Sequence, residues 1–260
     1  MTAGTARGIS LDRVTALFDP ARVPDLVDVS AGYLDLLGRD APRSRALGQS
    51  VMEGRLYPKV YNAWRPVAGR LAAGPRGLFE PKPERARLMR RFDPRVGATV
   101  LDIGCGPGNF TTAIADRVGP AGLVVGLDIS PTMLGRAVRV GARENIGYVR
   151  ADAQALPFPE GRFDAVSCFT ALFLMPDPFR ALDEMVRVLA PGGRLAVLTS
   201  CANAVAALRP AERFAASLAG VTIFGRHEIT DALRRRGVGG LVQDFAGAAQ
   251  VVAGAKPISG

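Results

Sequence analysis

Three glycines at alternate positions form the most distinctive short motif of the sequence. Gly104, Gly106 and Gly108 stand in TVLDIGCGPGNF, residues 99–110, directly after an apolar run that contains Asp102. Because glycine lacks a Cβ, such a loop can turn sharply and let a ligand approach the backbone closely. The free N–H groups of a following helix would favour anionic ligand groups. The motif therefore predicts a loop that binds a nucleotide-like ligand: a phosphate, a dinucleotide or another group.

The spacing of the glycines separates these ligands. A phosphate-binding P-loop requires GxxxxGK[ST], and the loop has neither the lysine nor the following Ser or Thr, which excludes it. A dinucleotide loop requires GxGxxG, whose third glycine would stand at residue 109, where the chain has Asn109. The GxGxG pattern therefore argues against NAD or FAD without excluding an NAD-dependent oxidoreductase.

Two further carboxylates follow apolar runs downstream of the loop. Asp128 closes VVGLD about 20 residues beyond Gly108, the spacing at which an acid accepts hydrogen bonds from a ribose diol. Asp152 occupies the equivalent place after YVR in YVRADAQALPF. The structural alternative is that either aspartate caps the helix that follows it.

Apolar runs and amphipathic segments alternate along the second part of the chain. Because the apolar runs are short and rich in valine and leucine, they indicate a parallel sheet that is covered on both faces. This alternation predicts an α/β fold with a doubly wound, mostly parallel sheet. We expect helices at residues 84–92, 109–118, 131–141 and 178–193, and strands at 98–104, 122–130, 146–152, 163–170 and 194–200.

The first part of the chain has a different character. Apolar residues recur with a helical period at 25–38 and 55–74, and the Gly- and Pro-rich stretch at 72–83 has the composition of a linker. We therefore expect two parts: an N-terminal helical lid or substrate region at 1–79 and a Rossmann-like domain at 80–260. On this division, deletion of the first 75 or so residues would leave ligand binding partly intact.

Composition limits the class of protein. The chain is 48% hydrophobic and 22% charged, which is ordinary for a globular protein with a sizeable core. No apolar run is long enough to span a membrane and no signal-peptide pattern is present, so we expect a cytoplasmic protein. The net charge of +9 suits nucleic acid, but the arginines are scattered, which argues against that partner.

Cysteine and histidine are too few for a metal or disulfide framework. Cys105, Cys168 and Cys201 form no CxxC pair, and His227 is the only histidine. We therefore expect no metal site and reduced thiols that pack as small apolar side chains. His227 precedes an amphipathic segment, and we interpret it as a surface residue at a helix start.

Five short sequence motifs, taken in their order along the chain, resemble a known family. The glycine loop, the two strand-end aspartates, FDAVSCFTALFLMPD and EMVRVLAPGGRLAVLTS are similar to the class I S-adenosylmethionine-dependent methyltransferases over residues 84–199. The resemblance is to the branch that includes the ubiquinone/menaquinone methyltransferases. It implies a seven-stranded sheet, whose last strand is antiparallel, and S-adenosylmethionine as cofactor.

The resemblance also implies roles for the residues of the loop. The three glycines would flank the methionine part of the cofactor, and Asp102 would orient its amino group. The backbone of Phe169 and Thr170 would line the same end. Cys105 lies within the loop beside the cofactor and would be a filler rather than a nucleophile. Asp102 could also serve only as a hydrogen-bond acceptor for the loop.

The nucleoside part of the cofactor would lie against the next two strand ends. By the same resemblance, Asp128 would accept the ribose hydroxyls, with Ile129 and Met133 near the adenine. Asp152 would accept from the adenine amino group, and the backbone N–H of Ala153 would face a ring nitrogen.

Two residues of the expected lid complete the cofactor set. Tyr61 or Arg65, in RLYPKVYNAWRP, would reach the cofactor carboxylate, for which Arg offers a bidentate contact. The alternative is a helix that packs its aromatic face on the core.

The methyl acceptor is expected to be a small apolar molecule. CFTALFLMPD lacks the [DN]PP[YFW] block that is typical of enzymes that methylate nitrogen in nucleic acids and proteins, and residues 201–225 are rich in alanine. We identify no general base. We expect methyl transfer to oxygen or carbon of a quinone, polyketide, phenolic or lipid-like metabolite, by a protein that could form a homodimer. The alternatives are an RNA methyltransferase and a protein that binds S-adenosylmethionine without transferring its methyl group.

Overall fold

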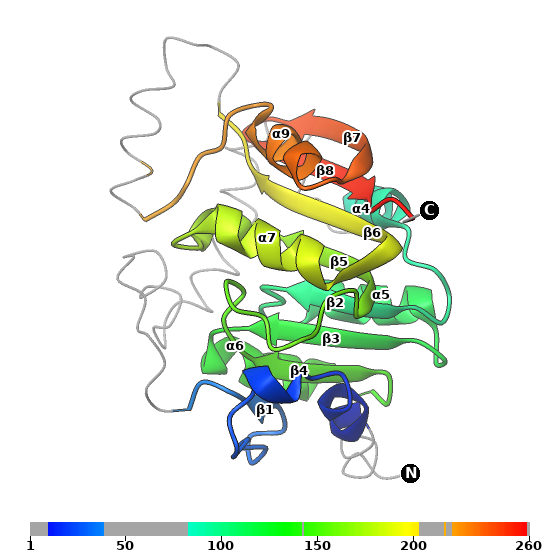
Figure 1. Ribbon diagram of the computed structural model, residues 1–260, viewed down its shortest axis with the longest axis vertical. Helices are drawn as coiled ribbons and strands as arrows, with labels where there is room; N and C mark the ends of the chain where they lie inside the picture. The colour runs from blue at the N-terminus through cyan, green and yellow to red at the C-terminus, as the bar shows by residue number, and fades with distance from the viewer. Residues whose placement is uncertain (1–9, 39–82, 142, 203–215, 217–219, 259–260) are drawn as a thin grey trace.

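The computed structural model describes residues 10–38, 83–141, 143–202, 216 and 220–258. In this part of the chain an eight-stranded sheet has helices on both faces (Figure 1). The strands are β1 (Leu34–Asp35), β2 (Thr99–Ile103), β3 (Leu123–Asp128), β4 (Ile146–Arg150), β5 (Phe163–Phe169), β6 (Leu189–Ser200), β7 (Gly239–Ala246) and β8 (Ala249–Ala255). The labelled helices are α4 (Pro83–Phe92), α5 (Asn109–Val118), α6 (Pro131–Val140), α7 (Pro178–Val188) and α9 (Glu228–Arg235), with 3-10 turns η1 (Pro20–Arg22) and η3 (Leu172–Leu174), and residues 10–15 are helical as well.

The strand order is β1-β4-β3-β2-β5-β6-β8-β7. Neighbours from β1 to β6 pair in parallel, whereas β8 runs antiparallel to both β6 and β7. The doubly wound α/β fold and its antiparallel last strand are thereby confirmed. The two-residue strand β1 adds one edge strand to the expected seven.

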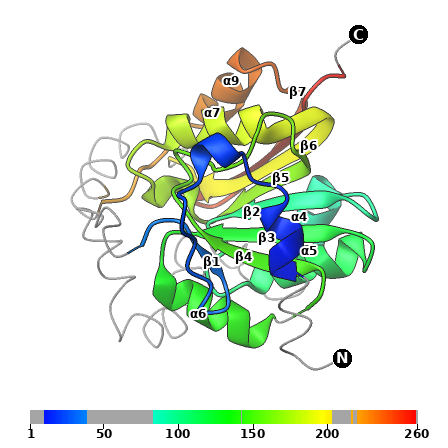
Figure 2. The ribbon, with the colours of Figure 1, turned by 60° about the horizontal axis from the view of Figure 1, so that its bottom comes forward.

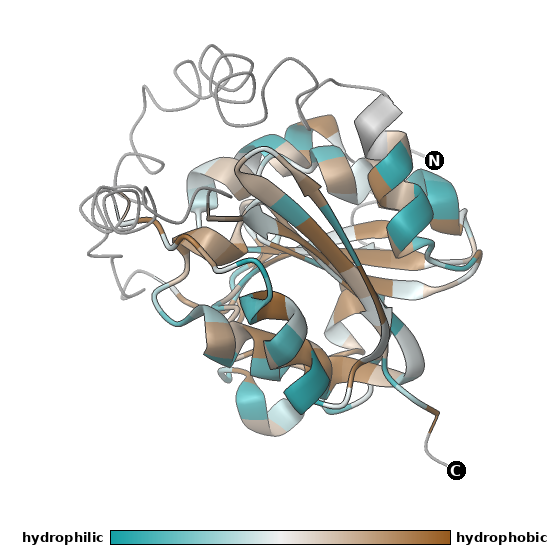
Figure 3. Cartoon of the chain, turned by 90° about the horizontal axis from the view of Figure 1, so that it is seen from above, coloured by the Kyte–Doolittle hydropathy of each residue, from teal (hydrophilic) through white to brown (hydrophobic). Residues whose placement is uncertain are grey.

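Each face of the sheet has its own layer of apolar side chains. One layer joins Val14 and Leu17, from the N-terminal segment, to α7 and α9. The other joins α4, α5 and α6 to the opposite side of the same strands. The N-terminal segment lies over the sheet on the side of α7 in Figure 2, and Figure 3 shows apolar residues concentrated on the strands between the helices. This double coverage explains why the strands read as continuous apolar runs.

Side-chain caps fix the beginnings of two helices at the carboxyl edge of the sheet. The Ser130 hydroxyl accepts from the Met133 N–H before α6, and the Asp177 carboxylate accepts from the Arg180 N–H before α7. Both helices then begin with proline, whose missing N–H is not needed in the first turn. The expected starts at residues 131 and 178 are confirmed.

The expected helix at 25–38 is wrong. This segment forms turns, an isolated bridge between Asp28 and Asp35, and strand β1. The carboxylate of Asp28 accepts from the Ser30 N–H, and that of Asp35 accepts from the N–H groups of Leu37 and Gly38. Such local bonds compete with helix formation, and pairing with β4 favours the extended chain.

The boundary between α7 and β6 also differs from the expectation. The helix ends at Val188, and β6 already begins at Leu189 rather than at Arg194. Gly192, with a φ of +75°, lies inside this strand, where the pairing with β5 shifts register. The LAPGG block therefore forms the irregular start of a strand instead of the end of a helix.

Several expectations fall outside the described residues. They include the helical segment at 55–74 with Tyr61 and Arg65, and most of the apolar stretch at 201–225. The division at residue 79 stays a prediction, although residues 10–38 pack on the same sheet as the rest of the chain. Among the described helices, none is long and apolar enough to cross a membrane.

Candidate functional site

The glycine loop is anchored to the end of the neighbouring strand β3. The N–H groups of Gly104 and Cys105 both donate to the carbonyl of Leu127, at 2.7 and 3.0 Å. Gly104, Gly106 and Gly108 have φ values of +65°, +54° and +83°, which L-residues with a side chain rarely adopt. Because Gly108 immediately precedes α5, the loop leads directly into a helix N-terminus.

The three glycines are required for different reasons. A Cβ on Gly104 would lie 2.2 Å from the Cβ of Ala171, and a Cβ on Gly108 would lie 2.7 Å from the Tyr148 hydroxyl oxygen. A Cβ on Gly106 would have no atom within 4 Å. Gly104 and Gly108 are thus explained by contacts within the protein. Gly106 is the glycine of this loop that faces open space.

The Asp128 carboxylate binds the loop at Gly106, the glycine that faces open space. Its Oδ2 accepts from the Gly106 N–H at 2.8 Å, and its Oδ1 accepts from the Ser130 N–H at 2.9 Å. Burial raises the pKa of this carboxyl, while the hydrogen bonds from Ser130 and Gly106 act in the opposite direction. A carboxylate can accept about four hydrogen bonds, so beside the backbone N–H groups of Gly106, Ser130 and Ile129 it keeps acceptor capacity for a ligand.

Asp102 lies beneath the loop and is only 1% exposed. Its two oxygens accept from the hydroxyls of Thr111, in α5, and Ser167, in β5, at 2.7 and 2.8 Å. Burial raises the pKa of Asp102 to about 6, although both hydroxyls favour the charged form. The carboxylate therefore joins α5 to the middle of the sheet, and its expected role toward the loop or a cofactor stays a prediction.

The buried carboxyl of Asp102 predicts a pH-dependent stability. Between about pH 4 and 6 the folded chain retains a proton that the unfolded chain releases, so the free energy of unfolding falls as pH rises through this window. A shift from 3.8 to about 6 corresponds to about 3 kcal/mol. Asp102→Asn should lack this slope. Urea unfolding of both proteins at pH 4 to 7 measures it, and parallel stability curves would contradict the assignment.

The third aspartate, Asp152, makes a local turn. It accepts from the backbone N–H and the side-chain amide of Gln154, at 2.9 and 3.1 Å. Nearby, Ala153 and Met133 are buried and Ile129 is half-buried. The structure thus brings the expected nucleoside-binding residues to adjacent strand ends, and Asp152 forms a turn with Gln154 rather than the helix cap considered as its alternative.

Thr170, the first residue after β5, has a strained backbone. Its φ is +64°, an outlier for a β-branched residue. Its N–H donates to the Leu198 carbonyl at 2.8 Å, and Ala171, the next residue, contacts Gly104. Phe169 is buried, with its ring centroid 5.0 Å from that of Phe110. Such strain persists where the surroundings enforce it, commonly at functional sites.

This strain can be measured by substitution. We expect Thr170→Gly to raise the free energy of unfolding by about 1 kcal/mol, because glycine relieves a left-handed conformation that costs about 1–2 kcal/mol. The larger backbone entropy of glycine in the unfolded chain offsets part of the gain. Thr170→Ala, which keeps a Cβ at the same φ, is the control. Equal stability of the two variants in urea unfolding would show that the backbone is not strained.

Four contact residues of this region have no signal in the sequence. They are Thr111 and Ser167, which bind Asp102, Ala171, which contacts Gly104, and Tyr148, which lies under Gly108. The contacts of all four residues depend on which strands are neighbours in the sheet. The three cysteines are free and buried, and His227 is exposed and directly precedes α9, which confirms both expectations.

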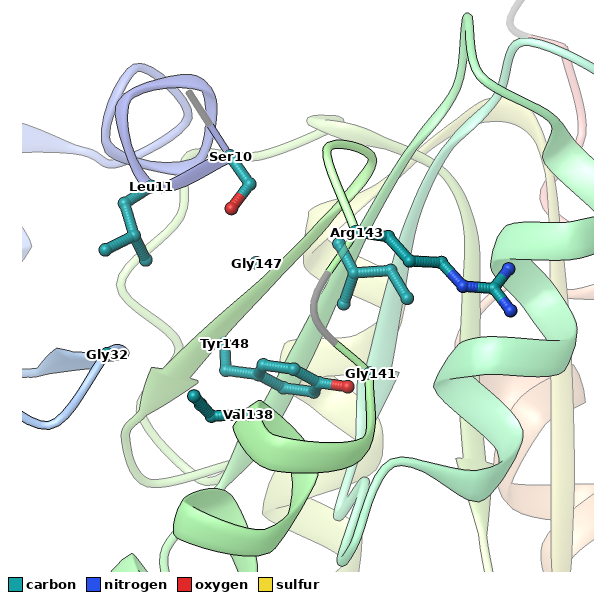
Figure 4. Close-up of a pocket in the computed structure, with 9 residues that line it drawn as sticks. Ser10, Leu11, Gly32, Val138, Gly141, Arg143, Gly147 and Tyr148 are labelled. Atoms are coloured by element: carbon teal, nitrogen blue, oxygen red, sulfur yellow. The ribbon is translucent and has the colours of Figure 1, made fainter. Parts of the chain in front are cut away.

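A small pocket in the described part of the chain lies elsewhere. It is found at the amino end of β4, between residues 10–11 and the end of α6 (Figure 4). None of the expected cofactor residues lines it. We therefore take the carboxyl edge of β2, β3 and β4, and not this pocket, as the candidate site.

Comparison with known proteins finds a family that the region of this site resembles. Residues 101–197 match the family described as "Methyltransferase domain", and they run from within β2 into β6 and include the loop and all three aspartates. Over these residues the chain is similar to that family, and it has the glycine loop and the antiparallel last strand that the sequence resemblance implied.

Curated relatives align over the same region. The demethylmenaquinone methyltransferase of Lactococcus lactis is 41% identical over 114 residues, which cover 43% of this chain and 45% of the relative. The ubiquinone/menaquinone biosynthesis C-methyltransferase UbiE of Hahella chejuensis is 46% identical over 121 residues, covering 43% and 49%. The alignments thus span about half the length of these relatives.

A solved structure supports the fold over a longer range. Phosphoethanolamine N-methyltransferase 2 of Haemonchus contortus, in complex with phosphomonomethylethanolamine and S-adenosylhomocysteine, superposes with a TM-score of 0.65. The match covers 81% of this chain and 60% of that protein at 16% identity. At this identity the similarity concerns the fold alone.

Proposed function

We propose that this protein binds S-adenosylmethionine at the carboxyl edge of β2, β3 and β4 and transfers its methyl group to a small apolar acceptor. The observation that carries the proposal is the bond between the Gly106 N–H and the Asp128 carboxylate, beside the one loop glycine with open space. A ribose diol can bind the remaining lone pairs of Asp128 there. The methyltransferase domain and its quinone-methylating relatives support the same cofactor.

The residues of the chain would act by binding and orienting the two reactants. Methyl transfer from a sulfonium is an in-line displacement, in which alignment within a dry site supplies much of the rate. Gly104, Gly106, Gly108 and the strained Thr170 would enclose the methionine end. Asp102 would act from beneath the loop on the cofactor's amino group.

For the acceptor we propose a quinone-type or phenolic ring that is methylated at carbon or oxygen. Phe173, Leu174 and Met175 are half-buried just beyond β5 and offer an apolar surface at the methionine end. The relatives' names specify demethylmenaquinone and carbon methylation for those proteins. We further propose that, within residues 1–79, the part that follows the packed segment 10–38 acts as a lid in which Tyr61 or Arg65 binds the cofactor carboxylate.

Removal of the Asp128 carboxylate tests the cofactor site. We expect Asp128→Ala to weaken binding of S-adenosylhomocysteine by about 1–3 kcal/mol, the scale of lost hydrogen bonds to a charged group. Calorimetric titration gives the affinity. Asp164, an exposed carboxylate on β5 that binds the Thr99 N–H, provides the control Asp164→Ala. Equal affinities of the wild type and Asp128→Ala would remove Asp128 from the ribose contact.

The transfer reaction itself can be tested with the full chain. Incubation with methyl-labelled S-adenosylmethionine and chemically reduced demethylmenaquinone should yield a labelled, methylated quinone, identified by mass spectrometry. Labelled RNA in a parallel incubation would favour an RNA methyltransferase instead. Binding of S-adenosylmethionine without label transfer to the quinone, to RNA or to any component of a host extract would contradict the proposed activity and leave a binding protein.

A further inference from the structure

Arg150, the last residue of β4, has a side chain that is only 12% exposed and makes three hydrogen bonds. Its Nη1 donates to the Asp35 carboxylate at 2.9 Å and to the Gly38 carbonyl at 2.8 Å. Its Nε donates to the Ile129 carbonyl at 3.1 Å. One guanidinium thus connects the N-terminal segment to the turn that follows β3.

The bond to Ile129 acts on the peptide group that binds Asp128. The carbonyl of Ile129 and the N–H of Ser130 belong to the same planar peptide unit. Arg150 donates to the carbonyl oxygen of this unit, and the N–H of the same unit, from Ser130, donates to Asp128 Oδ1 at 2.9 Å. Because the unit is rigid, the guanidinium fixes the direction of the hydrogen bond that orients the carboxylate.

Asp35 fixes the guanidinium from the other side. Its Oδ2 binds Arg150, and its Oδ1 accepts from the N–H groups of Leu37 and Gly38, both at 3.0 Å. Backbone pairing of β1 with β4 holds Asp35 opposite Arg150 in the register. A continuous set of bonds therefore runs from residues 34–38 through Arg150 and the Ile129–Ser130 peptide to Asp128 and Gly106.

We propose that Arg150 is a positioning residue for the Asp128 carboxylate and that Asp35, through Arg150, couples residues 34–38 to the nucleoside half of the cofactor site. The proposal rests on the cofactor site proposed above. Coupling of this kind is reciprocal: a ligand that binds Asp128 stabilises the bonds around Asp35, and loss of those bonds weakens the ligand.

The first test measures ligand affinity in a matched pair of variants. We expect Arg150→Gln to bind S-adenosylhomocysteine about 3–20-fold more weakly, a loss that lies within the range for contacting groups of one network. The factor should be the same for 5′-methylthioadenosine, which lacks the amino-acid half. Arg236→Gln is the control, since Arg236 binds Asp183 and the carbonyls of Ala232 and Phe179 with a similarly buried side chain. It should leave both affinities unchanged.

A double-mutant cycle then separates positioning from a general loss of stability. In an Asp128→Asn background, Arg150→Gln should have no further effect on affinity, because the carboxylate that it orients is gone. The same 3–20-fold loss in both backgrounds would overturn the proposal, as would wild-type affinity of Arg150→Gln.

A measurement on the wild type covers the case in which Arg150→Gln does not fold. Saturating S-adenosylhomocysteine should slow amide hydrogen exchange at Leu37 and Gly38, whose N–H groups bind Asp35. Unchanged exchange at these two amides, with the ligand bound, overturns the coupling while the cofactor site stands. Absence of binding to the wild type contradicts the proposed function itself and the coupling with it.

Discussion

Gly104→Ala is expected to lower the free energy of unfolding by about 2–5 kcal/mol and to abolish measurable binding of S-adenosylhomocysteine. The new Cβ would lie 2.2 Å from the Cβ of Ala171, far inside van der Waals contact. Overpacking of this kind costs about 1–3 kcal/mol, and the left-handed φ of +65° adds about 1–2 kcal/mol. Relief requires a shift of Ala171, which follows the strained Thr170. Urea unfolding and calorimetry measure the two effects.

Two further variants separate the overlap from the backbone strain. Ala171→Gly removes the opposing Cβ, so the double variant Gly104→Ala/Ala171→Gly should recover the overlap part of the loss but not the strain. Gly106→Ala has a φ of +54° and no atom within 4 Å of the added Cβ, so it should lose only about 1–2 kcal/mol. Equal losses for Gly104→Ala and Gly106→Ala would contradict the packing argument.

Removal of residues 1–38 is expected to leave a chain without a stable fold. Val14, Leu17 and Leu34 are buried against the sheet, and each contributes about 1.5–3 kcal/mol. The sum is comparable to the whole stability of a typical domain. The sequence-based expectation is the opposite, that deletion of the first 75 or so residues leaves binding partly intact, and the same truncation distinguishes the two. Circular dichroism and thermal unfolding of the truncated chain measure the outcome.

Point variants provide the control for this truncation. Leu34→Ala, at a residue 3% exposed in the core, should cost about 2–5 kcal/mol, whereas Leu26→Ala, at a residue 90% exposed, should change stability by less than about 0.5 kcal/mol. A truncated chain that unfolds cooperatively and binds S-adenosylhomocysteine like the full chain would restore the two-part interpretation.

Much of the architecture could be predicted because it depends on local patterns. Continuous apolar runs specified buried parallel strands, and Ser130 and Asp177 before prolines marked the starts of α6 and α7. The prediction of a helix at 25–38 was wrong. Its apolar residues do recur with a helical period, but Asp28 and Asp35 form local turns and β4 offers a pairing partner. A period read along the chain cannot register a partner more than one hundred residues away.

The candidate site, too, could be predicted from the sequence only in part. By itself, the sequence determined the fold class and which residues stand at the strand ends: the glycine loop, Asp128 and Asp152. The tertiary structure decided what each of them contacts. It buries Asp102 between two hydroxyls, packs Ala171 against Gly104, leaves Gly106 facing open space, and connects Arg150 to both Asp35 and the peptide beside Asp128. The physical reason is that residue order fixes local conformation and strand ends, whereas these contacts arise only when strands distant in sequence become neighbours in the sheet.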